Sequence, residues 1–520
     1  MQNTQKPLTD IDSDHGASPL NQRILPEVLI QVFLYACPAP SLDEVRLVSS
    51  RNHRRRLLNL THVCGTWREI AHNTPKLWSV IGIELLDTAP REYEWVEFCI
   101  DKSSKASGLS IFLAVRNAPR SHPNWQKAVN RKALGNFFSA VSLDLRLRSI
   151  IQHSDRWEHL SIILSQPPIV GYLLHTFASH IVDEPKLPQL RSLSVSLSPI
   201  ASDCNVWGLH RPAHEVDALQ SAPHLKRVRY TTEEVAWAPM EGMPWYSPIP
   251  LPLIQLTELI LEPVSSDQIH LLLEILISCP ELRHLHAGSL MQDDMDPESQ
   301  TYLQSVRLEH LISLSISGEG HSVASFLDSI QVPSLERLAI AVDYNAWPQF
   351  AIQEFLSGVS STLRTLEIGE SLLPRDSLVP CLSRTPKLEV FSITQSSFDR
   401  RLAEDLLRTL TDTGTSASAS SSTTLDMALL PDLKSFRLTL SRARISEEIN
   451  LALFHKMIMS RVGENRAVRL QSASICITSD IHRGQPRFKP GGLAQLAEMK
   501  KNGFCVDIFY KVGKVSRRIL

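Results

Sequence analysis

The feature that most constrains this chain is a short leucine phrase that returns many times along it. The phrase reads as a proline or polar residue followed by L-x-x-L-x-[IVL], and its apolar positions alternate as they do in β-strands. Its copies begin at Leu190, Leu225, Leu256, Leu282, Leu311, Leu335, Leu363, Leu388 and Leu433, with a related segment at Trp157. Successive copies lie 24 to 35 residues apart, except for a final interval of 45. This period predicts a stack of similar units, none of which can bury its apolar face alone.

Segments with helical periodicity alternate with these predicted strands. QIHLLLEILISC precedes Pro280 and SVASFLDSI precedes Val332, while GLSIFLAVR and DRWEHLSIIL add strands ahead of the first clear copy. The fold class is therefore α/β, a solenoid of the leucine-rich repeat type. The long final interval holds TDTGTSASASSSTT, which has nothing to bury, so we expect a disordered loop over residues 411–424. The segment NGFCVDIFY near the end is expected to add a closing strand.

The N-terminal part has a different pattern. The first twenty residues are polar and predict a disordered tail, and three small helices are expected between residues 24 and 81. The stripe of the first helix consists of Leu29, Val32, Phe33 and Ala36, and that of the second of Leu60, Val63, Cys64, Trp67 and Ala71. Thr74 and Pro75 begin a third helix. The segment between the first two helices, about residues 38–58, is longer than a usual connection and is expected to be an inserted loop.

Charge and composition exclude several classes of function. The formal net charge is −2 and the pI is near 6.8, so no overall field draws this chain to nucleic acid or membrane. No signal-peptide h-region and no run of eighteen uncharged apolar residues is present. The eight cysteines are scattered singly, which favours reduced thiols over disulfides or zinc. We expect a soluble intracellular protein, cytoplasmic, nuclear or both.

Signatures of catalysis are missing from the sequence. It contains no GxSxG, P-loop, strand-linked GxGxxG or HExxH motif, so we expect no enzymatic activity, no catalytic residue and no cofactor. His284 and His286 stand two apart on one predicted strand but lack a third ligand, so no metal site is predicted. For the basic run of residues 51–56 we favour a solvated loop; the alternatives are a nuclear localisation signal or contact with acidic groups on a partner.

The N-terminal helices resemble a known family. The segments ILPEVLIQVFLYAC and LTHVCGTWREIAHNTPKLWSVI are similar to an F-box, in the form abundant among fungal F-box proteins. The first carries the family's Glu-[IV]-Leu and [IV]-Phe, and the second its V-C-x-x-W-R-x-[IL]-A followed by T-P-x-L-W. The chain departs from the pattern at its start, because Pro26 stands one residue later than the proline of the family's leucine-proline pair.

The resemblance implies a substrate-recognition adaptor of an SCF-type cullin-RING ubiquitin ligase. Its F-box would bind a Skp-type adaptor and its solenoid a protein target that the sequence does not identify. The adaptor-binding residues implied are Ile24, Leu25, Pro26, Glu27, Val28, Leu29, Val32, Phe33, Val63, Cys64, Trp67, Ile70, Ala71, Leu77 and Trp78. The expected organisation is a tail at 1–20, an F-box domain at 21–82, a linker with the first strand at 83–150, and the solenoid at 151–520. The alternative is a leucine-rich repeat scaffold without a ubiquitin role, whose N-terminal helices only cap the array.

Overall fold

The computed structural model describes most of the chain, with gaps. The described residues are 24–38, 47–85, 91–104, 107–115, 145–164, 187–197, 217–220, 222–232, 251–262, 264–265, 269–291, 305–343, 347–369, 377–395, 400–411, 429–440, 448–449, 451–462, 470–479, 487–488, 492–512 and 515–519. The expected N-terminal tail and nearly all of the expected loop at 411–424 lie outside them.

One large sheet dominates the described part of the chain. Its path is β1-β2-β3-β4-β5-β6-β8-β10-β12-β13-β14-β15-β17-β19-β20, with β7 paired beside β8. The strands are β1 Val80–Leu85, β2 Leu109–Val115, β3 Trp157–Leu164, β4 Ser192–Leu197, β5 Arg227–Thr232, β6 Glu258–Glu262, β7 Val264–Ser265, β8 His284–Met291, β10 Ser313–Glu319, β12 Arg337–Asp343, β13 Thr365–Ile368, β14 Val390–Gln395, β15 Ser435–Leu440, β17 Ser472–Ser479, β19 Cys505–Val512 and β20 Val515–Arg518. Neighbours on this path pair in parallel, as in β4 and β5, until β20 returns antiparallel to β19.

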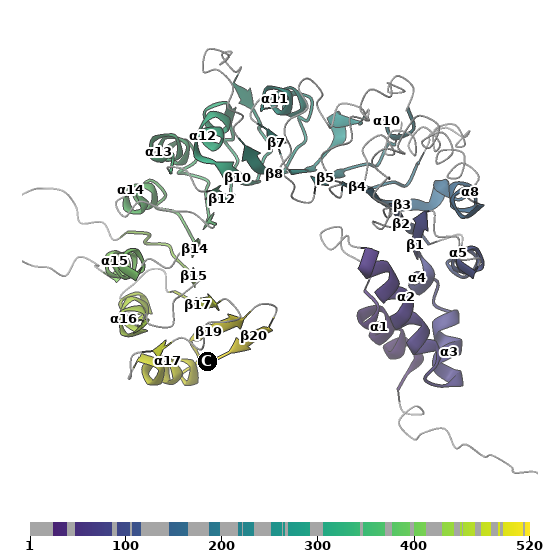
Figure 1. The fold of residues 1–520 in the computed structure, drawn as a ribbon. Helices are drawn as coiled ribbons and strands as arrows, with labels where there is room; N and C mark the ends of the chain where they lie inside the picture. The colour runs from purple at the N-terminus through teal and green to yellow at the C-terminus, as the bar shows by residue number, and fades with distance from the viewer. Residues whose placement is uncertain are drawn as a thin grey trace, which may run out of the picture.

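The sheet bends into an arc with its strands on the inner face and helices on the outer face (Figure 1). The outer helices are α5 Arg91–Lys102, α8 Leu145–Ile151, α10 Asp217–Gln220, α11 Ile269–Ile277, α12 Gly320–Asp328, α13 Gln349–Gly358, α14 Leu378–Ser383, α15 Arg400–Thr411, α16 Leu451–Val462 and α17 Gly492–Lys501. Two short pairs accompany the main sheet, β9 Val306–Arg307 with β11 Ile330–Gln331, and β16 Glu448–Ile449 with β18 Arg487–Phe488.

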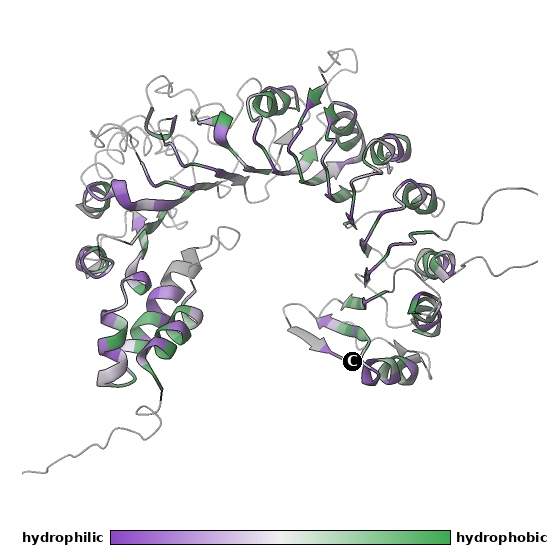
Figure 2. Ribbon diagram, turned by 180° about the vertical axis from the view of Figure 1, so that it is seen from behind, coloured by the Kyte–Doolittle hydropathy of each residue, from purple (hydrophilic) through white to green (hydrophobic). Residues whose placement is uncertain are grey.

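The repeated phrase explains this architecture. In the copy at Leu335, the side chains of Leu335, Leu338 and Ile340 are all buried between the sheet and the helices. Each turn before a strand is closed locally, as where the Leu335 N–H donates to the Val332 carbonyl at 3.2 Å. Polar residues alternate with these apolar ones and face the inner side of the arc, so the strand ribbons alternate in hydropathy (Figure 2). Along each strand every second side chain is buried, and a new unit begins every 24 to 35 residues. Together these two patterns produce the mixed α/β fold.

Four helices form a bundle at the N-terminal end of the arc. They are α1 Pro26–Ala36, α2 Leu47–Thr61, α3 Gly65–His72 and α4 Pro75–Trp78. Trp78 is fully buried and its indole N–H donates to the Ala71 carbonyl at 2.7 Å, which ties α4 to α3. The His53 ring on α2 lies 3.3 Å from the Leu77 carbonyl. Both α2 and α4 contact β1, so the bundle continues directly into the sheet.

The structure confirms a mixed α/β fold with a large parallel sheet, and every copy of the leucine phrase forms a strand of it. The expected loop at about 38–58 is wrong over its second half, because α2 begins at Leu47. The prediction of one continuous helix from Leu60 to Ala71 is also wrong, because α2 ends at Thr61 and a new helix, α3, follows. The Cys64 sulfur caps α3 by accepting a hydrogen bond from the Trp67 N–H at 3.4 Å.

Two further expectations need correction. The first strand of the sheet is β1, which begins at Val80, so it starts before the range 83–150 to which the sequence assigned it. That range also contains α5, a helix that the sequence pattern did not predict. The strand over NGFCVDIFY exists as β19, but β20 follows it at the sheet's end.

Candidate functional site

Helix α1 has two apolar faces, and only one of them is used inside the protein. Leu29 and Phe33 point into the bundle and are 3% and 0% exposed. Leu25, Val28, Val32 and Tyr35 are 66%, 49%, 48% and 88% exposed. These four residues follow a 3-4-3 spacing that places them along one side of the helix. We call them the α1 stripe.

The side chains beneath the stripe are held firmly. Phe33 packs on Trp67 with ring centroids 4.9 Å apart, and Trp78 packs edge-on against Phe98 of α5 at 5.0 Å. Such aromatic pairs stabilise a core beyond the area that they bury. The stripe is therefore presented on a packed bundle rather than on a loop, which favours recognition by a partner with little loss of conformational freedom.

The residues that the resemblance implied for adaptor binding fall into three groups. Leu29, Phe33, Ala71, Leu77 and Trp78 are buried in the core; Cys64, Trp67 and Ile70 are half-buried; Ile24, Leu25, Pro26, Glu27, Val28, Val32 and Val63 are exposed. The first group therefore supports a surface from beneath and has no area to offer a partner. Tyr35 was missed by the sequence analysis, although its spacing of three from Val32 and seven from Val28 is the signal that would have found it.

The basic run at residues 51–56 lies on α2 and not on a solvated loop. His53 is buried, and the guanidinium carbon of Arg54 lies 4.5 Å from the centre of the Trp95 ring. Such a cation–π contact joins α2 to α5 and uses part of the run for packing. Burial lowers the pKa of His53, so this side chain is neutral at pH 7 and adds no charge to the run.

No group of three or more His, Cys, Asp or Glu side chains among the described residues is arranged to hold a metal ion. His284 and His286 both lie on β8, and the His286 ring contacts the Glu262 carboxylate of the neighbouring β6. None of the described helices combines the length and the apolar character needed to span a membrane.

Comparison with known proteins adds little. No family model matches the chain, and no curated protein matches it. Among solved structures, it is similar to a crystal structure of a structural genomics target from Bacteroides fragilis, with 12% sequence identity and a TM-score of 0.29. That match covers 64% of this chain and 68% of the other. A likeness at this level carries no inference about fold or function.

Proposed function

We propose that the protein is an F-box adaptor: its N-terminal bundle binds a Skp-type adaptor through the α1 stripe, and its arc holds a target protein for ubiquitination. The observation that carries this proposal is where exposed apolar side chains gather. Of the thirteen large hydrophobic residues that are exposed in the described chain, six lie between Ile24 and Val63. The others are spread singly over separate elements, where exposed apolar residues need no explanation.

An apolar stripe on one helix is the kind of surface that a partner helix or groove covers. Burying apolar area stabilises a complex by roughly 25 cal/mol per Å². Partners commonly bind a helix through side chains at positions i, i+3 and i+7, which lie along one face. The stripe lies within the residues that resemble the F-box family. The resemblance and the exposure therefore support the same surface, although each rests on a different property of the chain.

The bundle and the arc would then act as one rigid spacer. Because α2 and α4 pack directly on β1, a partner bound at the α1 stripe has a fixed orientation relative to the inner face of the arc. A target held there would have one of its lysines kept near the ubiquitin-charged enzyme that the partner recruits. The contribution of this chain is proximity, which raises effective concentration without a nucleophile of its own.

A repeat scaffold without a ubiquitin role remains the second candidate, and one observation favours it. The bundle covers the free edge of the sheet at β1, which is also what a terminal cap of a repeat array does. Under that reading the α1 stripe would have no Skp-type partner.

Binding of the full-length chain to a purified Skp-type adaptor, measured by calorimetry, separates the two candidates. The test variant is Val28→Asp/Val32→Asp, which puts charge on the stripe without touching the core. The control is Ile277→Asp/Met459→Asp, two residues of α11 and α16 that are 54% and 51% exposed. We expect the stripe variant to lose at least about a hundredfold in affinity and the control to bind as the unmodified chain does. No binding by the folded unmodified chain, or equal losses in both variants, would overturn the proposal.

A further inference from the structure

The inner face of the arc carries a regular row of side chains where strands β4, β5, β6 and β8 begin. The row consists of Arg191, Lys226, Thr257 and Arg283, and we call it the strand-entry row. The Lys226 N–H donates to the Arg191 carbonyl at 3.0 Å, the Thr257 N–H to Lys226 at 2.9 Å, and the Arg283 N–H to Thr257 at 2.9 Å. Each residue is therefore held at the same level as its neighbour, about 4.8 Å away across the sheet.

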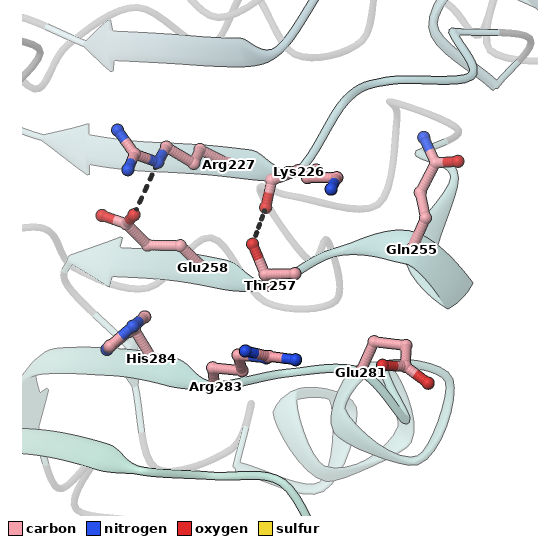
Figure 3. Close-up of a pocket in the computed structure, with 8 residues that line it drawn as sticks. All are labelled: Lys226, Arg227, Gln255, Thr257, Glu258, Glu281, Arg283 and His284. Atoms are coloured by element: carbon pink, nitrogen blue, oxygen red, sulfur yellow. Dashed lines mark hydrogen bonds and ion pairs between the residues drawn. The ribbon is translucent and has the colours of Figure 1, made fainter.

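Two open hollows adjoin along this row. One, of about 520 Å³, is lined by His159, Arg191, Ser192, His224, Lys226, Arg227 and Thr257. The other, of about 540 Å³, is lined by Lys226, Arg227, Gln255, Thr257, Glu258, Glu281, Arg283 and His284, as Figure 3 shows. The lining of the first hollow holds three cations and no carboxylate. This concentration of positive charge stands out in a chain whose net charge is −2.

Two carboxylates, those of Glu258 and Glu281, lie beside the row in the second hollow. Arg227 is paired with Glu258, whose carboxylate lies 3.0 Å from its Nε, and this is the one ion pair that Figure 3 draws. For Arg191, Lys226 and Arg283, no acidic partner is found among the residues that the structure describes. The side chains of all three are exposed, so they remain hydrated and available to an anion.

The remaining groups of the first hollow are polar but neutral. Burial lowers the pKa of His159, and the nearby charges of Arg227 and Arg191 act in the same direction while Glu158 opposes them. This imidazole therefore stays neutral at pH 7, and its Nδ1 is hydrogen-bonded to the Ser192 hydroxyl. The charge of the hollow comes from its guanidinium and ammonium groups, with hydroxyl and imidazole groups to complete hydrogen bonds.

We propose that the strand-entry row binds an acidic, extended peptide segment of the target. From Arg191 to Arg283 the row covers three strand steps, or about 14 Å, which an extended chain spans in about four residues. Carboxylates at alternate positions of such a segment are about 7 Å apart and all face the same side. They match a line of cations better than one compact anion does, because a single phosphate reaches only one part of the row. Complementary charge of this kind fixes the register and orientation of a partner.

This inference deepens the proposed function, because it rests on the proposal that the arc holds a target and states what chemistry that target presents. Its failure can be told apart from failure of the adaptor role. Peptide binding is measured without any adaptor, and the stripe variant Val28→Asp/Val32→Asp should bind the peptide as the unmodified chain does.

The experiment is fluorescence anisotropy of the full-length chain with a short labelled peptide of alternating Glu and Gly. A peptide with Gln in place of Glu and a single-stranded oligonucleotide of equal charge are measured in parallel. The test variant is Arg191→Glu/Lys226→Glu, and a milder variant, Arg191→Gln/Lys226→Gln, guards against loss of the fold. The control, Lys456→Glu/Lys501→Glu, makes the same change of charge at exposed positions on the outer helices α16 and α17.

We expect the Glu peptide to bind, the Gln peptide to bind at least tenfold more weakly, and added salt to reduce the difference. The charge-reversed variant should lose at least tenfold in affinity, the neutral variant should lose less, and the control should lose none. Equal binding of the Glu and Gln peptides, or equal loss in the control, would overturn the proposal. Tighter binding of the oligonucleotide, lost in the same variant, would overturn it in favour of nucleic acid.

Discussion

Val28 and Leu29 are adjacent in α1, but Val28 is 49% exposed whereas Leu29 is buried in the bundle and only 3% exposed. Substitution to alanine should therefore have very different effects at the two positions. Leu29→Ala removes core volume beside Phe33 and should cost about 2–4 kcal/mol of unfolding free energy. Val28→Ala should change it by less than about 0.5 kcal/mol. Urea denaturation followed by the fluorescence of the bundle tryptophans measures both, and similar losses for the two variants would contradict the orientation of α1.

Arg461 of α16 should be a local anchor of the array. It is 2% exposed and donates from all three guanidinium nitrogens, to the carbonyls of Leu410 at 3.0 Å, Leu430 at 2.8 Å and Leu429 at 2.6 Å. In the sequence, Leu410 precedes residues 412–428 and the two other leucines follow them. The Arg461 guanidinium therefore joins the end of α15 to the start of the next unit. Arg461→Met would remove the guanidinium donor from all three carbonyls, of which that of Leu430 keeps the Leu433 N–H, and should cost about 3 kcal/mol locally.

Hydrogen exchange of the α15 and α16 amides is the measurement for Arg461→Met. The matched control is Arg408→Met on α15, because Arg408 is exposed and its ion pairs within the described part of the chain are with Glu404 and Asp405 of its own helix. That substitution should change exchange by less than about 0.5 kcal/mol. If both variants left the protection of α16 unchanged, the anchoring role of Arg461 would be refuted.

Gly318 sits where β10 shifts register against β8. Its φ of +148° is one that side chains rarely allow, and a Cβ there would collide with the Leu290 backbone. Gly318→Ala should destabilise the array by about 1–3 kcal/mol. Gly358, in the last turn of α13, has open space around it, and Gly358→Ala should instead stabilise the protein by about 0.5 kcal/mol. Opposite signs in thermal denaturation are the expected outcome, and a stabilising Gly318→Ala would contradict the bulge.

The strands could be predicted from sequence because the apolar positions in each copy of the leucine phrase show which of its side chains are buried. Leu335, Leu338 and Ile340 lie close together in the chain and all face the core, so the local pattern is sufficient. Helix α2 gave no such signal. Its polar sequence LVSSRNHRRRLLNLT is held by tertiary contacts, including buried Leu57 and the stacking of Arg54 on Trp95. The periodicity of such a segment cannot distinguish a helix from a loop.

The surfaces proposed for binding were harder to read. In α1, the residues Val28, Leu29, Val32 and Phe33 are all apolar, so the sequence indicates a helix without telling its inner face from its outer one. The strand-entry row does have a sequence signal, because each of its residues directly follows the first leucine of a copy of the phrase. The sequence does not show that Arg191, Lys226 and Arg283 lie in one line on the sheet, because that arrangement depends on backbone hydrogen bonds between units.

The stability of the inner face should depend on pH through Glu262. A hydrogen bond from His286 lowers the pKa of Glu262 below its usual 4.5, although burial acts in the opposite direction. Because the folded-state pKa is depressed, the contribution is present above pH 4.5 and is lost as the pH falls through the lowered value. Glu262→Gln should therefore be less stable than the unmodified chain at neutral pH, with a difference that shrinks in acid. A difference in denaturation midpoint that stays constant with pH would contradict this.

Thiol reactivity should report on the packing of the outer helices. Burial raises the pKa of Cys99 and Cys279 to about 12 and that of Cys381 to about 11, whereas Cys505 is exposed at the start of β19. Alkylation requires the thiolate, and at pH 8 a thiol with a pKa of 12 is ionised in roughly one molecule in 10,000. Burial also denies access to the reagent.

Iodoacetamide should therefore label Cys505 in the native protein long before these three buried thiols, with sites assigned by mass spectrometry. The buried thiols should react together with unfolding, because Cys99 lies in α5, Cys381 lies in α14 and Cys279 follows α11, and all three are buried in the core. Cys505→Ser should remove the rapid labelling at that site and leave the slow sites unchanged. Native labelling of Cys279 at a rate near that of Cys505 would mean that α11 does not pack on the sheet as the structure places it.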